Sequence, residues 1–229
     1  MADAGFFDEL DAVVAHRWTE IRDGAFWTHV LQNGMSRELY QTTMVEIFHY
    51  TRHNSINQAV AAWHASSPDD LHLLKFVYEH ADEELGHERM IVHDLESIGL
   101  SDEALYDQPP LPPTQALVGY LYYVSLTEGA KARLGYSYWA ESSYDELAPI
   151  LARARADLGL TDNNMTFFVA HSTIDVKHAE EVREAIAESV ATPEECEAVK
   201  RVADTTLYLS GRLMEAALEK HLAASQALV

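Results

Sequence analysis

The chain has 229 residues and carries 16 Lys plus Arg against 37 Asp plus Glu, a formal net charge of −21 that disfavours nucleic acid and membrane surfaces as partners. Hydrophobic residues make up 48% of the chain and no apolar run reaches the roughly 18 residues of a membrane span, which predicts one globular domain over residues 1–229. The single cysteine, Cys196, permits no internal disulfide and the start is acidic, unlike a signal peptide, so a cytoplasmic location is expected.

All elements are predicted to be helical, because helix start and stop signals recur while alternating strand patterns are nearly absent. Six long helical regions are predicted, over residues 4–32, 36–65, 67–99, 115–158, 161–190 and 192–222. A short helical turn and a proline-rich connector occupy residues 101–114, and Pro149 is expected to kink or split the fourth long region. The prediction is an all-α bundle of roughly seven helices joined mostly by short loops.

The third region has the clearest ends and an unusual inner face. Its start is signalled by three residues typical of a capped helix: Ser67, Pro68 and Asp70. Gly99 is typical of a helix end. A helix advances about 100° per residue, and on that spacing His80, Glu84 and His87 fall inside the apolar stripe that should face the core.

Three further regions also place ionisable or polar side chains inward. In residues 161–190, His171, Asp175 and His178 share a face with apolar residues. In the fourth region Glu141 lies on the inner side. The second region is apolar almost all round, which is typical of a central helix, yet one of its sides carries Glu46, Tyr50, His53 and Asn57.

Inward carboxylates need compensation, because burying one unpaired carboxylate costs several kcal/mol. The four acids on these faces are Glu46, Glu84, Glu141 and Asp175. Two divalent cations would cancel their charge, and carboxylate together with imidazole is the ligand set that suits iron or manganese. Paired helices with Glu-x-x-His hold two such metals in helical bundles, and this spacing occurs at Glu84 to His87 and at Glu46 to His49.

Each motif is weak when it stands alone. A single inward histidine is more often a core residue bonded to a backbone carbonyl, and Glu-x-x-His occurs by chance in many helices. The metal interpretation depends on the conjunction of two motifs on inner faces with inner acids on two further helices.

The motifs His171-x3-Asp175-x2-His178 and Glu84-x-x-His87, with Glu141 between them, resemble those of the haem-oxygenase-like diiron oxidases, which are iron-containing redox enzymes of the pyrroloquinoline-quinone-synthase and thiaminase II superfamily. The resemblance spans about residues 36–220. It implies a seven-helix haem-oxygenase-like bundle, a homodimer, two irons per chain as Fe(II)/Fe(III), O2 as co-substrate and an external reductant. It also implies an oxidase or oxygenase that acts on a small amine, amino-acid-derived or carboxylic-acid substrate by N-oxygenation or oxidative C–C cleavage.

Carried over residue by residue, the resemblance implies a set of metal ligands: Glu46, Glu84, His87, Glu141, His171, Asp175 and His178. The candidate catalytic groups are Glu141, His80 and Tyr50. His80 stands where some members have a glutamate, so it is open whether it acts as a ligand, a substrate contact or a proton relay. The candidate substrate contacts are His53, Asn57 and Arg52, the last as an anchor for a carboxylate. Whether Glu46 or His53 completes the metal site is also open.

Two other functions stay open. A metal-free oxidase like pyrroloquinoline-quinone synthase is one, although few Arg or Lys residues lie on inner faces to bind a polyanionic quinone precursor. A non-catalytic metal-binding or storage bundle is the other, although its ligand order normally alternates Glu and Glu-x-x-His. Thiaminase activity is disfavoured, because Ser137 stands where that enzyme has a nucleophilic cysteine before a Tyr-Trp pair.

Overall fold

Every regular element in the described part of the chain is a helix, which confirms the all-α prediction. The computed structural model describes residues 2–63 and 70–227, with the side chains of 173–176 left out. The elements are α1 (Ala4–Arg22), α2 (Ala25–Asn33), α3 (Arg37–Thr51), α4 (Asn54–Ala62), α5 (Leu71–Glu83), α6 (Glu88–Ser97), α7 (Glu103–Tyr106), α8 (Pro112–Thr127), α9 (Ala130–Ala140), α10 (Ser143–Leu158), the 3-10 turn η2 (Asp162–Asn164), α11 (Thr166–Ser189) and α12 (Pro193–Gln226). The predicted capping residues Ser67 and Pro68 lie outside the described residues.

The expected number of helices, seven, was wrong, because four of the long predicted regions are interrupted. The break between α5 and α6 contains Gly86, and the break between α8 and α9 contains Gly129, both with a positive φ that favours glycine. The break between α1 and α2 contains Gly24, and the breaks at Arg52–His53 and at Glu141–Ser142 contain no glycine. Pro149 was expected to kink or split the fourth long region, and it does not split it, because it lies inside α10.

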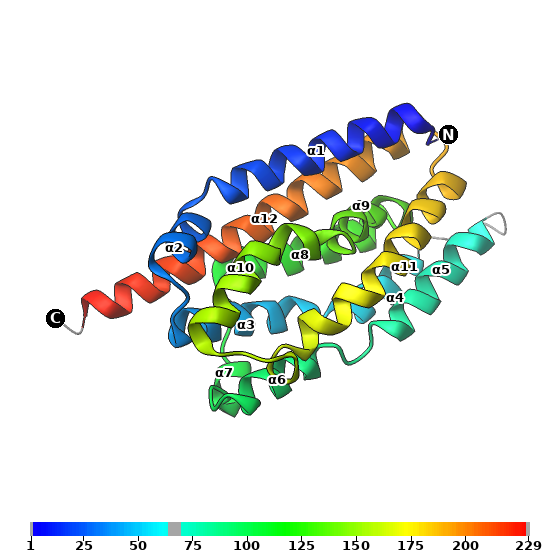
Figure 1. Cartoon of the computed structure of the whole chain (residues 1–229). Helices are drawn as coiled ribbons and strands as arrows, with labels where there is room; N and C mark the ends of the chain where they lie inside the picture. The colour runs from blue at the N-terminus through cyan, green and yellow to red at the C-terminus, as the bar shows by residue number, and fades with distance from the viewer. Residues whose placement is uncertain (1, 64–69, 228–229) are drawn as a thin grey trace.

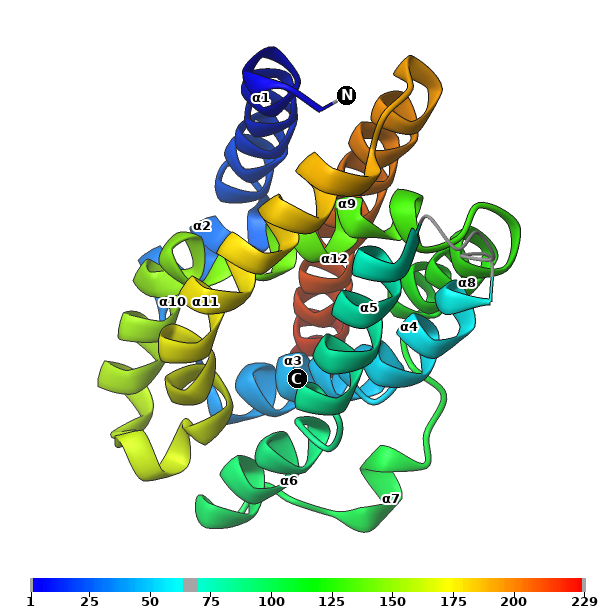
Figure 2. The ribbon, with the colours of Figure 1, turned by 90° about the vertical axis from the view of Figure 1, so that its right-hand side faces the viewer.

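The helices pack around α9 and α12, and this packing fixes the helices that carry the inner polar residues. In Figure 1 the first helix, α1, runs alongside α12, and α11 runs alongside α5. Figure 2 shows α9 behind α5 and α11, next to α12. The helices α9 and α12 approach closely at Gly135, where an added Cβ would collide with the carbonyl oxygen of Val199. Only glycine permits this approach, which sets the position of Glu141 at the end of α9.

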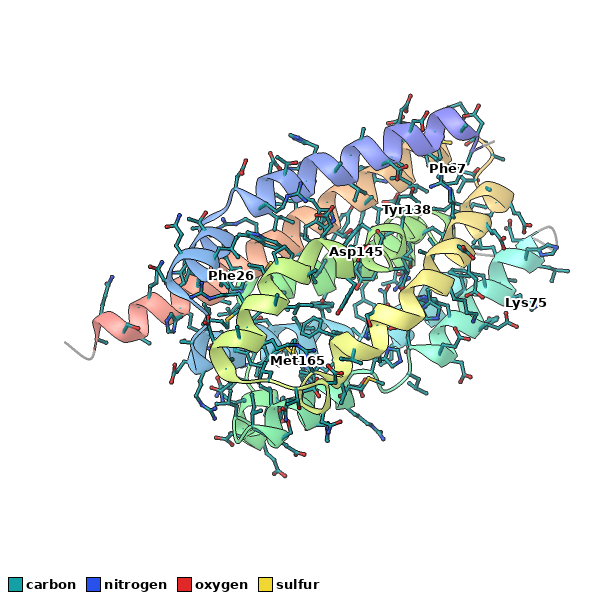
Figure 3. All side chains as sticks on the ribbon, viewed as in Figure 1. Phe7, Phe26, Lys75, Tyr138, Asp145 and Met165 are labelled. Carbon is teal, nitrogen blue, oxygen red and sulfur yellow. The ribbon has the colours of Figure 1, made fainter. Side chains whose placement is uncertain are left out.

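Aromatic contacts tie α1 to α9 on the outer side of this core. The rings of Phe7 and Tyr138 stack with their centroids 6.2 Å apart, and both are labelled in Figure 3. Trp18 meets Trp139 edge to face at 6.4 Å. In Figure 3, Lys75 projects outward from α5, as expected for the solvent side of an amphipathic helix.

A buried carboxylate holds the start of α11. Asp94, which has no exposed surface, accepts hydrogen bonds from the Thr166 N–H at 2.8 Å, the Thr166 hydroxyl at 2.6 Å and the Phe167 N–H at 3.0 Å. These bonds satisfy backbone donors that the first turn of a helix leaves free and place negative charge at the positive end of the helix dipole. Among the described residues, no helix is both long and apolar enough to cross a membrane.

Two Gly→Ala substitutions in helices should have opposite effects on stability. Gly135→Ala should lower the free energy of unfolding by about 2–3 kcal/mol, because its Cβ collides with the α12 backbone. Gly119→Ala in α8 should raise it by roughly 0.5–1 kcal/mol, because nothing lies within 4 Å of the added Cβ and alanine favours a helix. Urea unfolding measures both, and equal effects would contradict the close packing of α9 on α12.

Candidate metal centre

Six inner side chains from four parts of the chain converge in the bundle. They are His80, Glu84, His87, Glu141, His171 and His178, which come from α5, the α5–α6 break, the end of α9, and α11. Two groups of them could each hold a metal ion, since their potential ligand atoms lie within 4.8 Å of one another. The first group is His80, Glu84, Glu141 and His178, and the second is Glu84, His87 and His171. Glu84 belongs to both.

Three of the four histidines have one ring nitrogen bonded outside the cluster. His80 Nδ1 lies 3.0 Å from the Gln58 side-chain oxygen, and His171 Nδ1 lies 2.6 Å from the Phe167 carbonyl oxygen. His178 Nε2 lies 2.8 Å from Glu83 Oε2. These acceptors assign the N–H to the outer nitrogen and leave the lone pair of the other nitrogen for the cluster, which is the arrangement found around metal-bound histidines.

Polar atoms without partners mark the centre of the cluster. Among the described residues, His80 Nε2, Glu84 Oε1 and His87 Nδ1 are buried and have no hydrogen-bond partner. His80 Nε2 nevertheless faces Glu141 Oε1 at 3.2 Å, and His87 Nδ1 faces Glu84 Oε2 at 3.2 Å. Buried polar atoms in native proteins nearly always have partners, so three such atoms in one cluster fit a site for metal ions.

Imidazoles of the cluster offset the charge of its carboxylates. Burial raises the pKa of Glu141, but the adjacent imidazoles of His178 and His80 more than offset this and lower it to about 2. Burial lowers the pKa of His178, but its contacts with Glu141 have the larger effect and raise it to about 9. The pKa of His87 is raised by its contact with Glu84. The proton on His178 therefore supplies positive charge that a bound cation would replace.

Glu46 is not part of this cluster, although the sequence analysis included it among the ligands. Its carboxylate accepts a hydrogen bond from the Leu111 N–H at 3.0 Å and another from the Thr114 hydroxyl. Both donors belong to the start of α8, so a helix N-terminus compensates this buried carboxylate. Burial raises its pKa. His49, the partner of Glu46 in the Glu-x-x-His motif, is buried at 1% exposure and is also outside the two groups. Neither of its ring nitrogens has a hydrogen-bond partner in the described part of the chain.

A third group of possible ligands consists of Glu83, His178 and Glu181. Lys177 Nζ lies 3.1 Å from Glu83 and 3.2 Å from Glu181. The positive charge between these carboxylates is therefore already present, and Glu83 acts as the outer acceptor for His178.

The remaining candidates lie around the cluster. The side chain of Asp175 is outside the described residues. His53 contacts the Tyr122 hydroxyl at 3.0 Å, and its pKa is lowered by burial. Arg52 is exposed and lies over the Phe48 ring, so it does not face the cluster. Asn57 is buried and accepts a hydrogen bond from Arg133.

His53 and Asn57 line a second cavity of about 10 Å³, which is smaller than the main cavity described next.

The main cavity, of about 130 Å³, adjoins the cluster. Glu84, Glu141 and His171 line it on the cluster side, together with Tyr50 and Asn54. Most of the rest of its wall is apolar or aromatic: Trp18, Ile21, Phe26, Met35, Tyr40, Met44, Ile47, Tyr136, Trp139, Leu147, Ile150, Leu151, Phe167, Phe168, Leu213 and Met214. No Arg or Lys is among the described residues that line it. Burial raises the pKa of Tyr50 to about 12, so its phenol stays protonated and can donate.

Three supporting residues were missed by the sequence analysis. Asn54 Nδ2 donates to Glu84 Oε2 at 3.0 Å, Gln58 accepts from His80, and Arg133 donates to Asn54. Asn54 and Gln58 are four residues apart on α4 and face Glu84 and His80, which are four residues apart at the end of α5. Both pairs have the i, i+4 spacing that places side chains on one face of a helix. This shared spacing of two amides and two ionisable residues is a sequence signal that could have identified Asn54 and Gln58.

Comparisons with known proteins identify relatives of the chain. A family model described as iron-containing redox enzyme matches residues 43–210, a range that includes the whole cluster. A domain of unknown function with a heme oxygenase-like fold from Shewanella denitrificans is 38% identical, with a TM-score of 0.90 over 94% of this chain and 93% of that chain. No curated protein matches the chain.

More distant solved structures share the fold alone. A TenA homologue from Pseudomonas syringae pv. tomato is 13% identical, with a TM-score of 0.78 over 93% of each chain. A CADD-like protein of unknown function from Nostoc punctiforme is 14% identical, with a TM-score of 0.72 over 96% of each chain. The heme oxygenase-like fold expected from the sequence is therefore confirmed.

His49 should make the protein sensitive to acid. Burial lowers its pKa from about 6.5 to about 4, so between these values the unfolded chain binds a proton that the folded chain does not. The stability that neutral His49 contributes is present above pH 6.5 and is lost as the pH falls through 4, by about 3 kcal/mol in total. His49→Leu should flatten the dependence of unfolding free energy on pH from 6.5 to 4. Urea unfolding at several pH values measures this. An unfolding free energy that falls with pH as steeply in His49→Leu as in the wild type would contradict the prediction.

Proposed function

The chain belongs to the family of iron-containing redox enzymes, and from this premise we propose that it is a non-haem diiron oxidase or oxygenase that uses O2. The observation that carries the proposal is the pair of ligand groups that share Glu84. A carboxylate has two oxygens and can bind one metal ion with each, so a shared glutamate suits two neighbouring ions.

His80, Glu141 and His178 would hold one ion and His87 and His171 the other, with Glu84 between them. The Gln58 side-chain oxygen accepts a hydrogen bond from the Nδ1–H of His80, so the lone pair of His80 Nε2 is directed toward Glu141. This arrangement favours a ligand role for His80 over a proton relay. Asp175 enters the proposal as a further ligand on the resemblance alone. Iron ions bound here would supply the electron-transfer chemistry with O2.

The protein's own contribution is a dry cavity with few polar groups. Because the wall is mostly apolar, water is excluded and electrostatic interactions at the cluster are strengthened. Tyr50 lines the cavity together with Glu84 and Glu141, so its hydroxyl can orient the polar end of a substrate. We assign Tyr50 this positioning role, since its pKa of about 12 keeps its proton in place.

The cavity favours a small substrate with an apolar body and one polar head group. Its volume of about 130 Å³ is similar to that of an apolar cavity of about 150 Å³ that takes up benzene. A carboxylate head group would have to bind the metal ions, because no cationic side chain among the described residues lines the cavity. We therefore propose a small amine, amino-acid-derived or carboxylic-acid substrate, oxidised by N-oxygenation or C–C cleavage.

The alternatives are less well supported by this cavity. A metal-free oxidation of a polyanionic quinone precursor would require cations in the wall and more space. A storage bundle would not require a cavity beside the metals. Ser137, at the position expected for a thiaminase nucleophile, accepts a hydrogen bond from Arg133 and does not line the cavity. The homodimer and the external reductant are expectations from the resemblance, and the cytoplasmic location is an expectation from the single cysteine and the acidic start.

The shared glutamate predicts a distinct pattern of metal loss. Wild-type protein loaded anaerobically with Fe(II) should hold two irons per chain. Glu84→Ala should lose both, because it contributes to both groups, whereas His80→Ala and His171→Ala should each lose one, with affinity at the affected site lowered by more than about 100-fold. Metal analysis after gel filtration measures this.

His93→Ala is the matched control, since His93 is an exposed histidine on α6 outside both groups. Fewer than one iron per wild-type chain, unchanged in the Glu84 variant, would refute the diiron proposal and favour a metal-free oxidase. Two irons with no O2 consumption in the presence of any small amine or acid would favour storage.

Filling the cavity should weaken binding of small apolar ligands. Phenethylamine and 3-phenylpropionate serve as probes, and their binding should change the fluorescence of Trp18 and Trp139, which line the cavity. Ala154→Phe should weaken binding by about tenfold or more, because the ligand loses burial worth about 0.8 kcal/mol per CH2 group.

Ala223→Phe on the exposed end of α12 is the control. Benzene-1,3,5-tricarboxylate should not bind, because the described cavity wall offers no cation. Tight binding of this polyanion, or equal binding by both variants, would contradict the proposed substrate class.

A further inference from the structure

Arg133 on α9 is a buried cation with no carboxylate partner among the described residues. It is 4% exposed, and burial lowers its pKa to about 10. Its Nη1 donates to Ser137 Oγ at 3.1 Å, its Nε donates to the Asn57 side-chain oxygen, and its Nη2 donates to the Asn54 side-chain oxygen at 2.6 Å. The guanidinium also lies over the Tyr136 ring, 5.3 Å from the ring centroid. Burying a charge among partners that carry no negative charge is costly, so the place of this arginine calls for a further role.

Asn54 connects this cation to the candidate metal centre. Its oxygen accepts from Arg133 Nη2 and its NH2 group donates to Glu84 Oε2 at 3.0 Å. A guanidinium has only donors, so it fixes the orientation of the amide: the oxygen must face Arg133 and the NH2 group must face Glu84. Each bond in this series is charge-assisted, since one ends on a cation and the other on a carboxylate.

The contact with Asn54 also fixes the orientation of the Glu84 carboxylate. Oε2 is held between the Asn54 amide and His87 Nδ1, which lies 3.2 Å away. Oε1 points the other way, 3.9 Å from His178 Nδ1, and has no hydrogen-bond partner among the described residues. Each oxygen is thus directed at a different ligand group.

We propose that Arg133 and Asn54 are positioning residues for the metal centre, which hold the Glu84 carboxylate in the orientation that lets it serve both ligand groups. This inference rests on the proposed diiron function. It predicts that loss of the Asn54 amide affects the pairing of two bound ions, whereas loss of other contacts to Arg133 does not.

Asn57 provides a matched control on the same helix. Like Asn54, it accepts a hydrogen bond from Arg133, but no bond joins it to Glu84 or to any other member of the two ligand groups. Asn54→Ala and Asn57→Ala therefore each remove one acceptor from the buried cation, and only Asn54→Ala removes the donor to Glu84. A purely structural role for Arg133 predicts similar effects for both.

The test uses Mn(II) as the probe, with binding measured by calorimetry and the pairing of two ions by electron paramagnetic resonance. In wild type and Asn57→Ala, we expect two bound Mn(II) and a spin-coupled signal, with affinities within about threefold of each other. In Asn54→Ala, we expect the weaker site to lose about 10–100-fold in affinity and the coupled signal to give way to that of isolated Mn(II). Arg133→Lys, which keeps the charge but loses the planar fork, should resemble Asn54→Ala.

A coupled signal and wild-type affinities in Asn54→Ala would overturn the inference and leave the diiron proposal standing. Equal losses in Asn54→Ala and Asn57→Ala would also overturn it, in favour of a structural role. Wild-type protein that binds no pair of Mn(II) ions would overturn the metal proposal itself and this inference with it. Thermal unfolding of each variant identifies losses caused by misfolding, and the two asparagine variants decide the question if Arg133→Lys does not fold.

Discussion

Glu84 and Glu141 lie in an apolar interior, and no backbone N–H among the described residues neutralises either carboxylate. Two other buried acids have such partners, because Glu46 binds the start of α8 and Asp94 binds the start of α11. The negative charges of Glu46 and Asp94 are therefore each stabilised by a helix N-terminus, whereas Glu84 and Glu141 have no such partner among the described residues. The second pair depends on imidazoles in the metal-free protein, and replacing their protons with cations is the simplest way to complete the site.

The helix breaks place these groups. Glu84 and His87 lie on the turn between α5 and α6, Glu141 caps the end of α9, and Asn54 begins α4 directly after another break. A side chain at a helix end can approach the bundle centre at an angle that a continuous helix would not allow. By contrast, His171 and His178 lie within the continuous helix α11, and His80 lies within the last turn of α5. The close contact at Gly135 then fixes how far α9 brings Glu141 toward the other ligands.

Helical periodicity was sufficient to predict the all-α fold and to bring His80, Glu84 and His178 to inner faces. It could not identify what compensates a buried acid, since Glu46 has the same pattern as Glu84 but meets a helix N-terminus that is 65 residues away in the chain. It also failed across the break at Arg52–His53, which shifts the phase of the following helix. The inner side predicted through His53 and Asn57 therefore leads to the small cavity, while Asn54 and Gln58 reach the cluster.

The central claim is that two metal ions share Glu84. Anomalous diffraction at the iron absorption edge, from crystals of the Fe(II)-loaded protein, tests it most directly. The account predicts two peaks, one among His80, Glu141 and His178 and the other beside His87 and His171, with the Glu84 carboxylate between them. No peak in this cluster, or a single ion that Glu84 does not contact, would contradict it.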